Sequence, residues 1–159
     1  MKKLEACILF MVDEVSFEAP AFHNGETQRF SFDGDGVTVI AFFPGAFTGV
    51  CTEEMCEFRD SMNDFEDLNA NIIGVSVDTP FALKEFADQN DLNFTLVSDT
   101  SKEISEQYGV KTEMPGLEYE ISTRATFIVQ DGEVVYSEIL DDPSNLPDFK
   151  SLKQKLSEL

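Results

Sequence analysis

Short apolar runs alternate with helical patterns along this chain, and this alternation limits its fold more than any other feature. Three runs rich in β-branched and aromatic residues have the length of buried strands: VTVIAFF (37–43), NIIGVSVD (71–78) and FTLVSD (94–99). An apolar helical stripe of Met55, Phe58, Met62 and Phe65 follows the first run, and the other face of that helix carries Glu53, Glu54, Glu57, Asp60 and Asp64. Pro80 begins another helix after the second run. Strands that alternate with amphipathic helices predict an α/β fold.

The remaining segments extend this pattern. The runs ATFIVQ (125–130) and EVVYSEIL (133–140), joined by Asp131-Gly132, predict a β-hairpin, so we expect a mixed central sheet flanked by helices. A short helix should end at Gly109, and a last helix should begin near Asn145. Residues 14–36 are typical of an added N-terminal hairpin. The segment 111–123 lacks periodicity, and we expect it to be a functional loop.

Charge and cysteine content limit the partners and the compartment. The 159 residues include 31 Asp and Glu against 11 Lys and Arg, a formal net charge of −20, which excludes nucleic acid and anionic membranes as partners. The acidic residues are spread along the chain, so we interpret them as a solvating surface suited to a salt-rich, halophilic cytoplasm. No apolar run reaches the roughly 18 residues of a membrane span. The odd count of three cysteines indicates a reducing, cytoplasmic compartment.

A single domain is expected over residues 1–159. Met11 offers an alternative start, in which case residues 1–10 are an upstream extension. Cys7 lies in that segment and is interpreted as a thiol without a catalytic role.

The segment FFPGAFTGVCTEEMC (42–56) joins a buried strand to a helix, which is where α/β sheets place their ligand sites. Pro44 ends the strand, and Cys51 arrives in or near the first helical turn. The unpaired N–H groups and the dipole of a helix N-terminus favour an anion, so they favour the thiolate. Glu53 and Glu54 oppose that charge, and a nearby cation is therefore needed.

Arg124 is the candidate for this cation. It stands in STRATFIV, at the mouth of an otherwise apolar strand, where a guanidinium is costly unless an anion or a polar ligand meets it. In the expected topology this strand can lie beside the strand that ends at Pro44, which would bring Arg124 to Cys51. Arg59, next to Asp60, is interpreted as a surface or interhelix ion pair.

At these residues the chain resembles the peroxiredoxins. PGAFTGVC (44–51) resembles their signature Pro-x-x-x-Thr-x-x-Cys, Arg124 resembles their distant active-site arginine, and the likeness extends over residues 14–140. The resemblance implies a thioredoxin-like fold with an N-terminal hairpin and a peroxidatic Cys51 that reduces hydrogen peroxide or organic hydroperoxides through a sulfenic acid. It also implies that Thr48 and Arg124 orient the peroxide, that Pro44 shields the pocket, and that no cofactor or metal is needed. Electrons would come from a thioredoxin-like or small-molecule thiol.

Cys56 is the candidate resolving thiol. Five residues along an ideal helix place the two Cα atoms about 8.7 Å apart, whereas a disulfide needs less than about 7 Å. If Cys51 and Cys56 pair, the first turns of the helix must unwind. The spacing resembles that of the bacterioferritin comigratory protein group of peroxiredoxins. In the alternative interpretation Cys56 is a small core residue and an external thiol resolves Cys51.

Other functions stay open at this point. A dithiol–disulfide oxidoreductase on the same fold would have two residues between its cysteines, whereas four stand here. A non-enzymatic redox-sensing holdase is compatible with the acidic surface, as is a homodimer or larger homo-oligomer. Zinc would need a second Cys or His pair, and a plant-type iron–sulfur run would need a cysteine where Arg59 stands. His23, the only histidine, is expected in a turn without a catalytic role.

Overall fold

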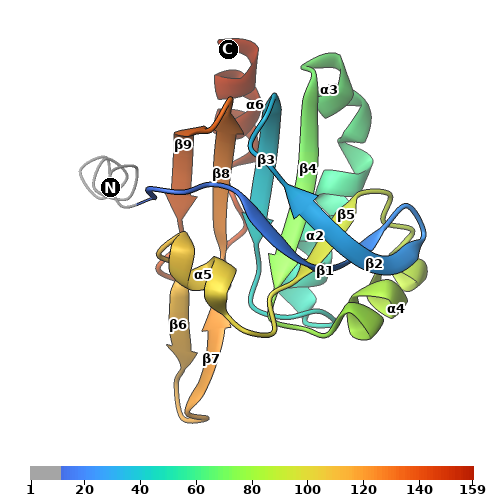
Figure 1. Cartoon of the computed structure of the whole chain (residues 1–159), viewed down its shortest axis with the longest axis vertical. Helices are drawn as coiled ribbons and strands as arrows, with labels where there is room; N and C mark the ends of the chain where they lie inside the picture. Colours follow the sequence, from blue (N-terminus) through green and yellow to red (C-terminus); the bar gives the residue numbers. More distant parts are fainter. Residues whose placement is uncertain (1–11) are drawn as a thin grey trace.

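A seven-stranded mixed sheet forms the centre of the molecule, which we describe from a computed structural model over residues 12–159. The strand order is β2-β1-β5-β4-β3-β8-β9, and a separate two-stranded hairpin, β6-β7, projects from the body (Figure 1). Cys7 and the segment 1–10 lie outside the described residues. The strands are β1 Phe17–His23, β2 Glu26–Phe32, β3 Val37–Phe42, β4 Ala70–Ser76, β5 Thr95–Ser98, β6 Lys111–Met114, β7 Tyr119–Ser122, β8 Ala125–Gln130 and β9 Glu133–Ile139.

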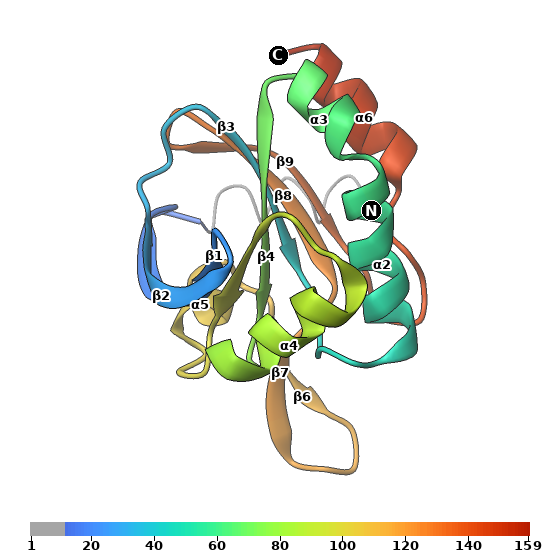
Figure 2. The same ribbon diagram turned by 90° about the vertical axis from the view of Figure 1, so that its right-hand side faces the viewer.

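Helices cover both faces of the sheet unequally (Figure 2). They are α2 Gly49–Asp60, α3 Met62–Asp67, α4 Pro80–Asn90, α5 Glu103–Gln107 and α6 Phe149–Ser157. One apolar cluster joins α2, α3, α4 and α6 to side chains such as Val39 and Ala41 of β3. Their strand neighbours Ile40 and Phe42 point to the other face, where α5 and the residues after it pack. This alternation follows from the two-residue period of a strand buried on both faces.

Strand β3 carries the chain into the site. It pairs in parallel with β4 and antiparallel with β8, and Phe42 lies opposite Ala125 in the second ladder. Because β8 runs against β3, its beginning lies at the carboxyl end of β3. The expected adjacency of Arg124 and the segment after β3 is therefore confirmed, and the α/β class with a mixed sheet and an N-terminal hairpin is confirmed with it.

Three expectations about local structure are wrong. Residues 111–123 contain the β6-β7 hairpin instead of an irregular loop, and its turn uses left-handed Gly116 and Glu118. The helical stripe through Met62 is broken at Ser61, which separates α2 from α3. The last helix begins at Phe149, because Asp148 caps it by accepting a hydrogen bond from the Ser151 N–H. Periodicity located the helices but not their caps or the exposed hairpin.

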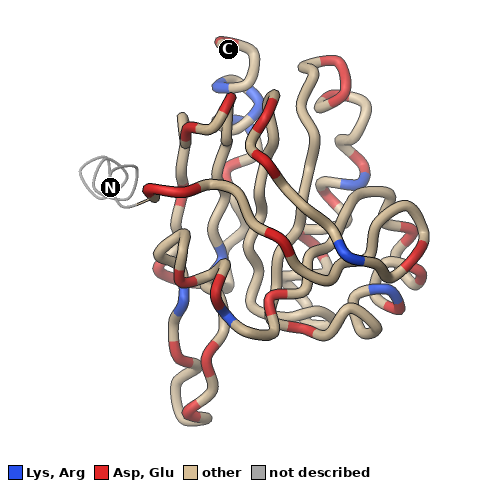
Figure 3. Tube along the Cα trace, in the orientation of Figure 1, with Lys and Arg blue, Asp and Glu red and all other residues tan. Residues whose placement is uncertain are grey.

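The acidic residues are distributed over the fold, as the sequence indicates. In Figure 3 Asp and Glu lie on nearly every element in view, whereas Lys and Arg are fewer and several of the lysines lie together on α6. No helix among residues 12–159 is both long and apolar enough to span a bilayer.

Candidate active site

Cys51 is buried in the first turn of α2. Its side chain is 1% exposed, and the preceding Thr48 is the N-cap in an extended conformation. The Thr52 N–H donates the first helical hydrogen bond to the Thr48 carbonyl oxygen, 2.9 Å away. No side chain in the described part of the chain caps this end of the helix. Cys51 therefore lies, as expected, among the N–H groups that a helix leaves without a helical partner.

The loop before Cys51 is held by contacts with α4 and with the end of β4. The Ala46 N–H donates to Asp78 Oδ2 at 2.7 Å, and Phe47 packs its ring edge-on against Phe86 with centroids 5.3 Å apart. Phe47 adopts a left-handed conformation, with φ of 68°, which is unusual for an aromatic residue. Thr48 Oγ1 donates to the Gly45 carbonyl oxygen at 2.8 Å. These contacts fix the path of residues 44–48 around the helix N-terminus.

Arg124 reaches Cys51 from the start of β8. Its side chain is 2% exposed, and Nη2 donates to Cys51 Sγ at 3.3 Å. Nε donates to the Pro143 carbonyl oxygen at 3.0 Å and Nη1 donates to Glu54 Oε1 at 2.6 Å. The planar guanidinium is therefore fixed by three different partners, and its charge faces the sulfur. Burial alone would lower the pKa of Arg124, but the Glu54 and Cys51 charges outweigh it and raise that pKa.

Glu54 is the site residue that the sequence analysis placed wrongly. We expected it on the polar face of the helix, yet it is fully buried and pairs with Arg124. Its spacing contained the signal, because Cys51, Glu54 and Phe58 recur at helical intervals and share one face. Burial raises the pKa of Glu54 to about 8, although the Arg124 charge and hydrogen bond lower it. Its Oε2 has no hydrogen-bond partner among the described residues.

A pocket opens next to these residues, with a volume of about 430 Å³. The β6-β7 hairpin forms one wall, so the segment 111–123 contributes to the site despite its different structure. Two further loops close the pocket, one before α2 and one after β9. Its lining residues include Pro44, Thr48, Cys51, Thr112, Met114, Pro115, Ile121, Arg124 and Pro143. Pro44, Thr48, Cys51 and Arg124, the site residues expected from the sequence, therefore all line one cavity. This cavity has the size of a small-molecule site.

Cys56 lies on the same helix but does not line this pocket. It is half-buried, and its Sγ is 3.8 Å from Asn90 Oδ1 at the end of α4. Cys51 and Cys56 are both thiols, and α2 is continuous between them. Phe47 does not line this pocket either. Its side chain is half-exposed, whereas Phe42 and Phe43 are buried in the core.

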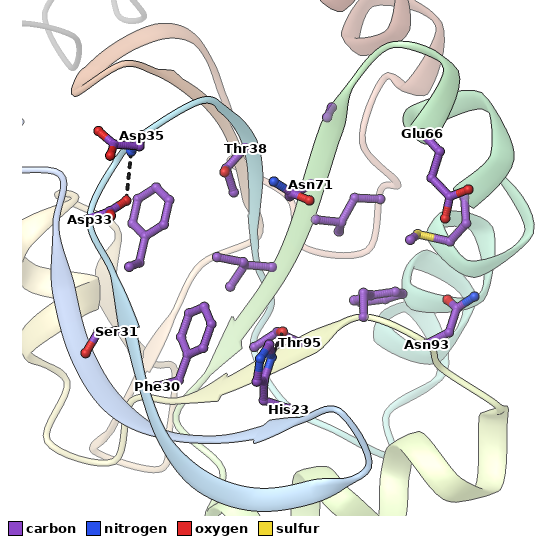
Figure 4. Close-up of a pocket in the computed structure, with 16 residues that line it drawn as sticks. His23, Phe30, Ser31, Asp33, Asp35, Thr38, Glu66, Asn71, Asn93 and Thr95 are labelled. Carbon is purple, nitrogen blue, oxygen red and sulfur yellow. Dashed lines mark hydrogen bonds between the residues drawn. The ribbon is translucent and has the colours of Figure 1, made fainter.

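A second cavity, of about 370 Å³, lies at the opposite end of the parallel strands (Figure 4). His23, which ends β1 instead of standing in a turn, places Nδ1 2.6 Å from Thr95 Oγ1 there. Asp33, Asp35 and Glu66 surround the opening in Figure 4. Its lining contains no cysteine, lysine or arginine, so it lacks the groups for thiol chemistry. Within residues 12–159 no three His, Cys, Asp or Glu side chains are grouped to hold a metal.

Comparisons with known proteins agree on one family. Residues 13–137 match the AhpC/TSA family. Peroxiredoxin Bcp of Escherichia coli K12 is 33% identical over 129 residues, which are 79% of this chain and 81% of Bcp. The mouse mitochondrial thioredoxin-dependent peroxide reductase is 34% identical over 88% of this chain and 55% of its own length. Two Mycobacterium tuberculosis peroxiredoxins are 35% identical to this chain over 103 residues. The matched segment covers 63% of this chain and 66% of each relative.

Solved structures show the same fold. The crystal structure of peroxidoxin BcpB from Mycobacterium tuberculosis superposes with a TM-score of 0.75 and 27% identity, over 92% of this chain and 94% of BcpB. Enterococcus faecalis AhpC superposes with a TM-score of 0.80 and 25% identity, over 92% and 89% of the two chains. With its thioredoxin-like fold and a buried cysteine in the wall of the pocket, the chain belongs to the AhpC/TSA family, as a peroxiredoxin of the Bcp group.

Proposed function

We propose that this chain is a thiol peroxidase in which Cys51 reduces hydrogen peroxide or an organic hydroperoxide. The contact that carries the proposal is the 3.3 Å hydrogen bond from Arg124 Nη2 to Cys51 Sγ inside a pocket of substrate size. A fixed guanidinium beside a buried sulfur stabilises the negative charge that the sulfur carries as it attacks. Membership of the peroxiredoxins supports the same activity.

The peroxide step requires negative charge to move along the S–O–O line. The Cys51 thiolate attacks one peroxide oxygen, the O–O bond breaks, and the other oxygen leaves with the bonding electrons and takes up a proton. Arg124 can follow this charge because its Nη2 donates to Cys51 Sγ, and Thr48 lines the same pocket. Such pre-positioned donors are worth most where water is excluded. Pro44 forms part of the pocket wall.

Completion of the cycle needs a second thiol. We assign this role to Cys56, which would condense with the Cys51 sulfenic acid to form a disulfide and release water. An external dithiol would then reduce that disulfide, and neither step requires a metal or an organic cofactor. The printed name of the mouse relative, a thioredoxin-dependent peroxide reductase, supports a thioredoxin-like reductant as the electron source.

Mass spectrometry after a single equivalent of hydrogen peroxide tests Cys51 as the cysteine that reduces peroxide and Cys56 as the resolving thiol. The wild type should lose two hydrogens as the disulfide forms. Cys51→Ser should consume no peroxide, and it should keep its mass. Cys56→Ser should instead gain one oxygen and hold it as a sulfenic acid until an external thiol is added. Peroxide consumption that survives Cys51→Ser would overturn the proposed function.

A further inference from the structure

Cys56 occupies a polar contact of its own between α2 and the end of α4. Its Sγ lies 3.8 Å from Asn90 Oδ1. The Asn90 amide is oriented by its other end, because Nδ2 donates to the Phe86 carbonyl oxygen at 2.9 Å. Asn90 therefore presents an acceptor to the Cys56 thiol. This arrangement differs from the apolar packing expected of a cysteine that serves only as a small core residue.

Arg59 brings a positive charge to the same place. It stands one helical turn after Cys56, and Nη1 donates to the Asn90 carbonyl oxygen at 2.6 Å. Cys56 and Arg59 thus converge on one residue of α4. The pKa of Arg59 is raised, first by its hydrogen bond to Asp60 and then by the charges of Cys56, Asp60 and Asp91. This attraction is reciprocal, so Arg59 stabilises negative charge that develops on the Cys56 sulfur as it reacts.

The two ends of α2 are anchored differently. Met55 and Phe58, which flank Cys56, are fully buried in the core. At the other end Thr48 and Gly49 are exposed, and no described side chain caps the first turn. Exposed residues therefore precede Cys51, whereas Cys56 lies between two core residues. This difference favours movement of the Cys51 end of α2 toward Cys56.

We propose that Arg59 and Asn90 are positioning residues for the resolving step: Asn90 holds the Cys56 thiol in place, and Arg59 stabilises the negative charge that develops on its sulfur as the oxidised Cys51 approaches. This inference rests on the proposed function. The Cys56 thiol gives up its proton as its sulfur attacks the Cys51 sulfur, the S–S bond forms and the S–O bond breaks. The hydroxide that leaves takes up a proton to become water, so no further oxidant or reductant takes part. Arg124 is not assigned this role, because each of its three side-chain nitrogens already has a partner, at Pro143, Glu54 and the resting Cys51 site.

Single-turnover mass spectrometry tests the role of Arg59. Reduced protein is mixed with one equivalent of hydrogen peroxide, and the species with one added oxygen is followed as it converts to the species lacking two hydrogens. In Arg59→Gln this conversion should slow by roughly tenfold, because the developing negative charge on the attacking sulfur loses its neighbouring opposite charge. The preceding gain of oxygen at Cys51 should keep its wild-type rate.

Two further variants separate charge from shape. Arg59→Lys keeps the charge and should restore most of the rate of disulfide formation. Arg29→Gln removes an exposed arginine that pairs with Glu18 in the β1-β2 hairpin, and it should behave as the wild type in both steps. Thermal unfolding of each variant verifies that it is folded.

The outcomes distinguish this inference from the proposed function. Equal conversion rates in wild type and Arg59→Gln overturn the role of Arg59, and equal slowing in Arg59→Gln and Arg59→Lys overturns its electrostatic part. If the wild type never loses two hydrogens, or if Cys56→Ser does so equally well, Cys56 is not the resolving thiol and the proposed cycle fails instead.

Discussion

Helix α2 carries two cysteines, and each lies beside an arginine, but the two pairs differ in burial. Cys51 and Arg124 are 1% and 2% exposed, whereas the Arg59 side chain is 30% exposed and Cys56 is half-buried. All three kinds of nitrogen in Arg124 have partners, so its charge is fixed in direction. The Arg59 side chain is more open to solvent than that of Arg124. The comparison therefore separates a fully buried cysteine–arginine pair from a more solvent-exposed one on the same helix.

Burial also changes what each ion pair costs. Arg124 and Glu54 have both lost their hydration, and this loss raises the pKa of Glu54 to about 8 even though a guanidinium nitrogen is 2.6 Å away. Arg59 and Asp60 keep more of their hydration, since their side chains are 30% and 64% exposed. The buried pair should therefore dominate both the chemistry and the pH dependence. The exposed pair should contribute little to stability.

The largest effect is expected from Arg124→Gln. This change removes the charge that faces Cys51 Sγ, and it should slow peroxide consumption by roughly a hundred- to a thousandfold, as the loss of a pre-positioned donor does in other sites. Stopped-flow measurement of the first oxidation step gives the rate. Arg29→Gln is the matched control. A rate within a few-fold of the wild type would show that the buried pair does not assist the reaction.

The next effect concerns the pH dependence of stability. Because the pKa of Glu54 is raised from 4.5 to about 8, the folded protein holds a proton between these values that the unfolded chain has released. This contribution to stability is fully present below about pH 4.5 and is lost as the pH rises to about 8. Relative to Glu54→Gln, the free energy of unfolding of the wild type should fall by up to about 1.4 kcal/mol per pH unit across this window.

Urea unfolding of both proteins between pH 5 and 8 measures this difference. Glu57→Gln removes an exposed carboxylate from the same helix and corrects for the loss of one negative charge. A difference between wild type and Glu54→Gln that stays constant with pH would mean that Glu54 is ionised throughout the range.

The smallest effect is expected from Asp60→Asn. Arg59 loses its exposed partner but keeps its hydrogen bond to Asn90, so the free energy of unfolding should change by less than about 1 kcal/mol. Urea unfolding gives this value, and the rate of disulfide formation should not change. A loss above about 2 kcal/mol would place the exposed pair on a level with the buried one and remove the contrast between them.

Much of this molecule could be predicted from local patterns. Apolar runs located β3, β4 and β5, and Asp131-Gly132 located the β8-β9 hairpin, because strand period and turn chemistry depend on neighbouring residues. The alternation of strands and helices was enough to place Arg124 near Cys51. The β6-β7 hairpin could not be predicted this way, since its strands are mostly exposed and carry no apolar alternation.

By itself the sequence determined the α/β class, the segment that carries Cys51, and the arginine expected beside it. Only the tertiary structure decided that Glu54 is buried against Arg124 and that Cys56 and Arg59 both contact Asn90 at the end of α4. The physical reason is that the sequence next to a carboxylate or a thiol in a helix does not show whether that side chain lies on an exposed or a buried face. Which face is covered depends on strands and helices distant in the chain, and their packing sets the charge each group meets.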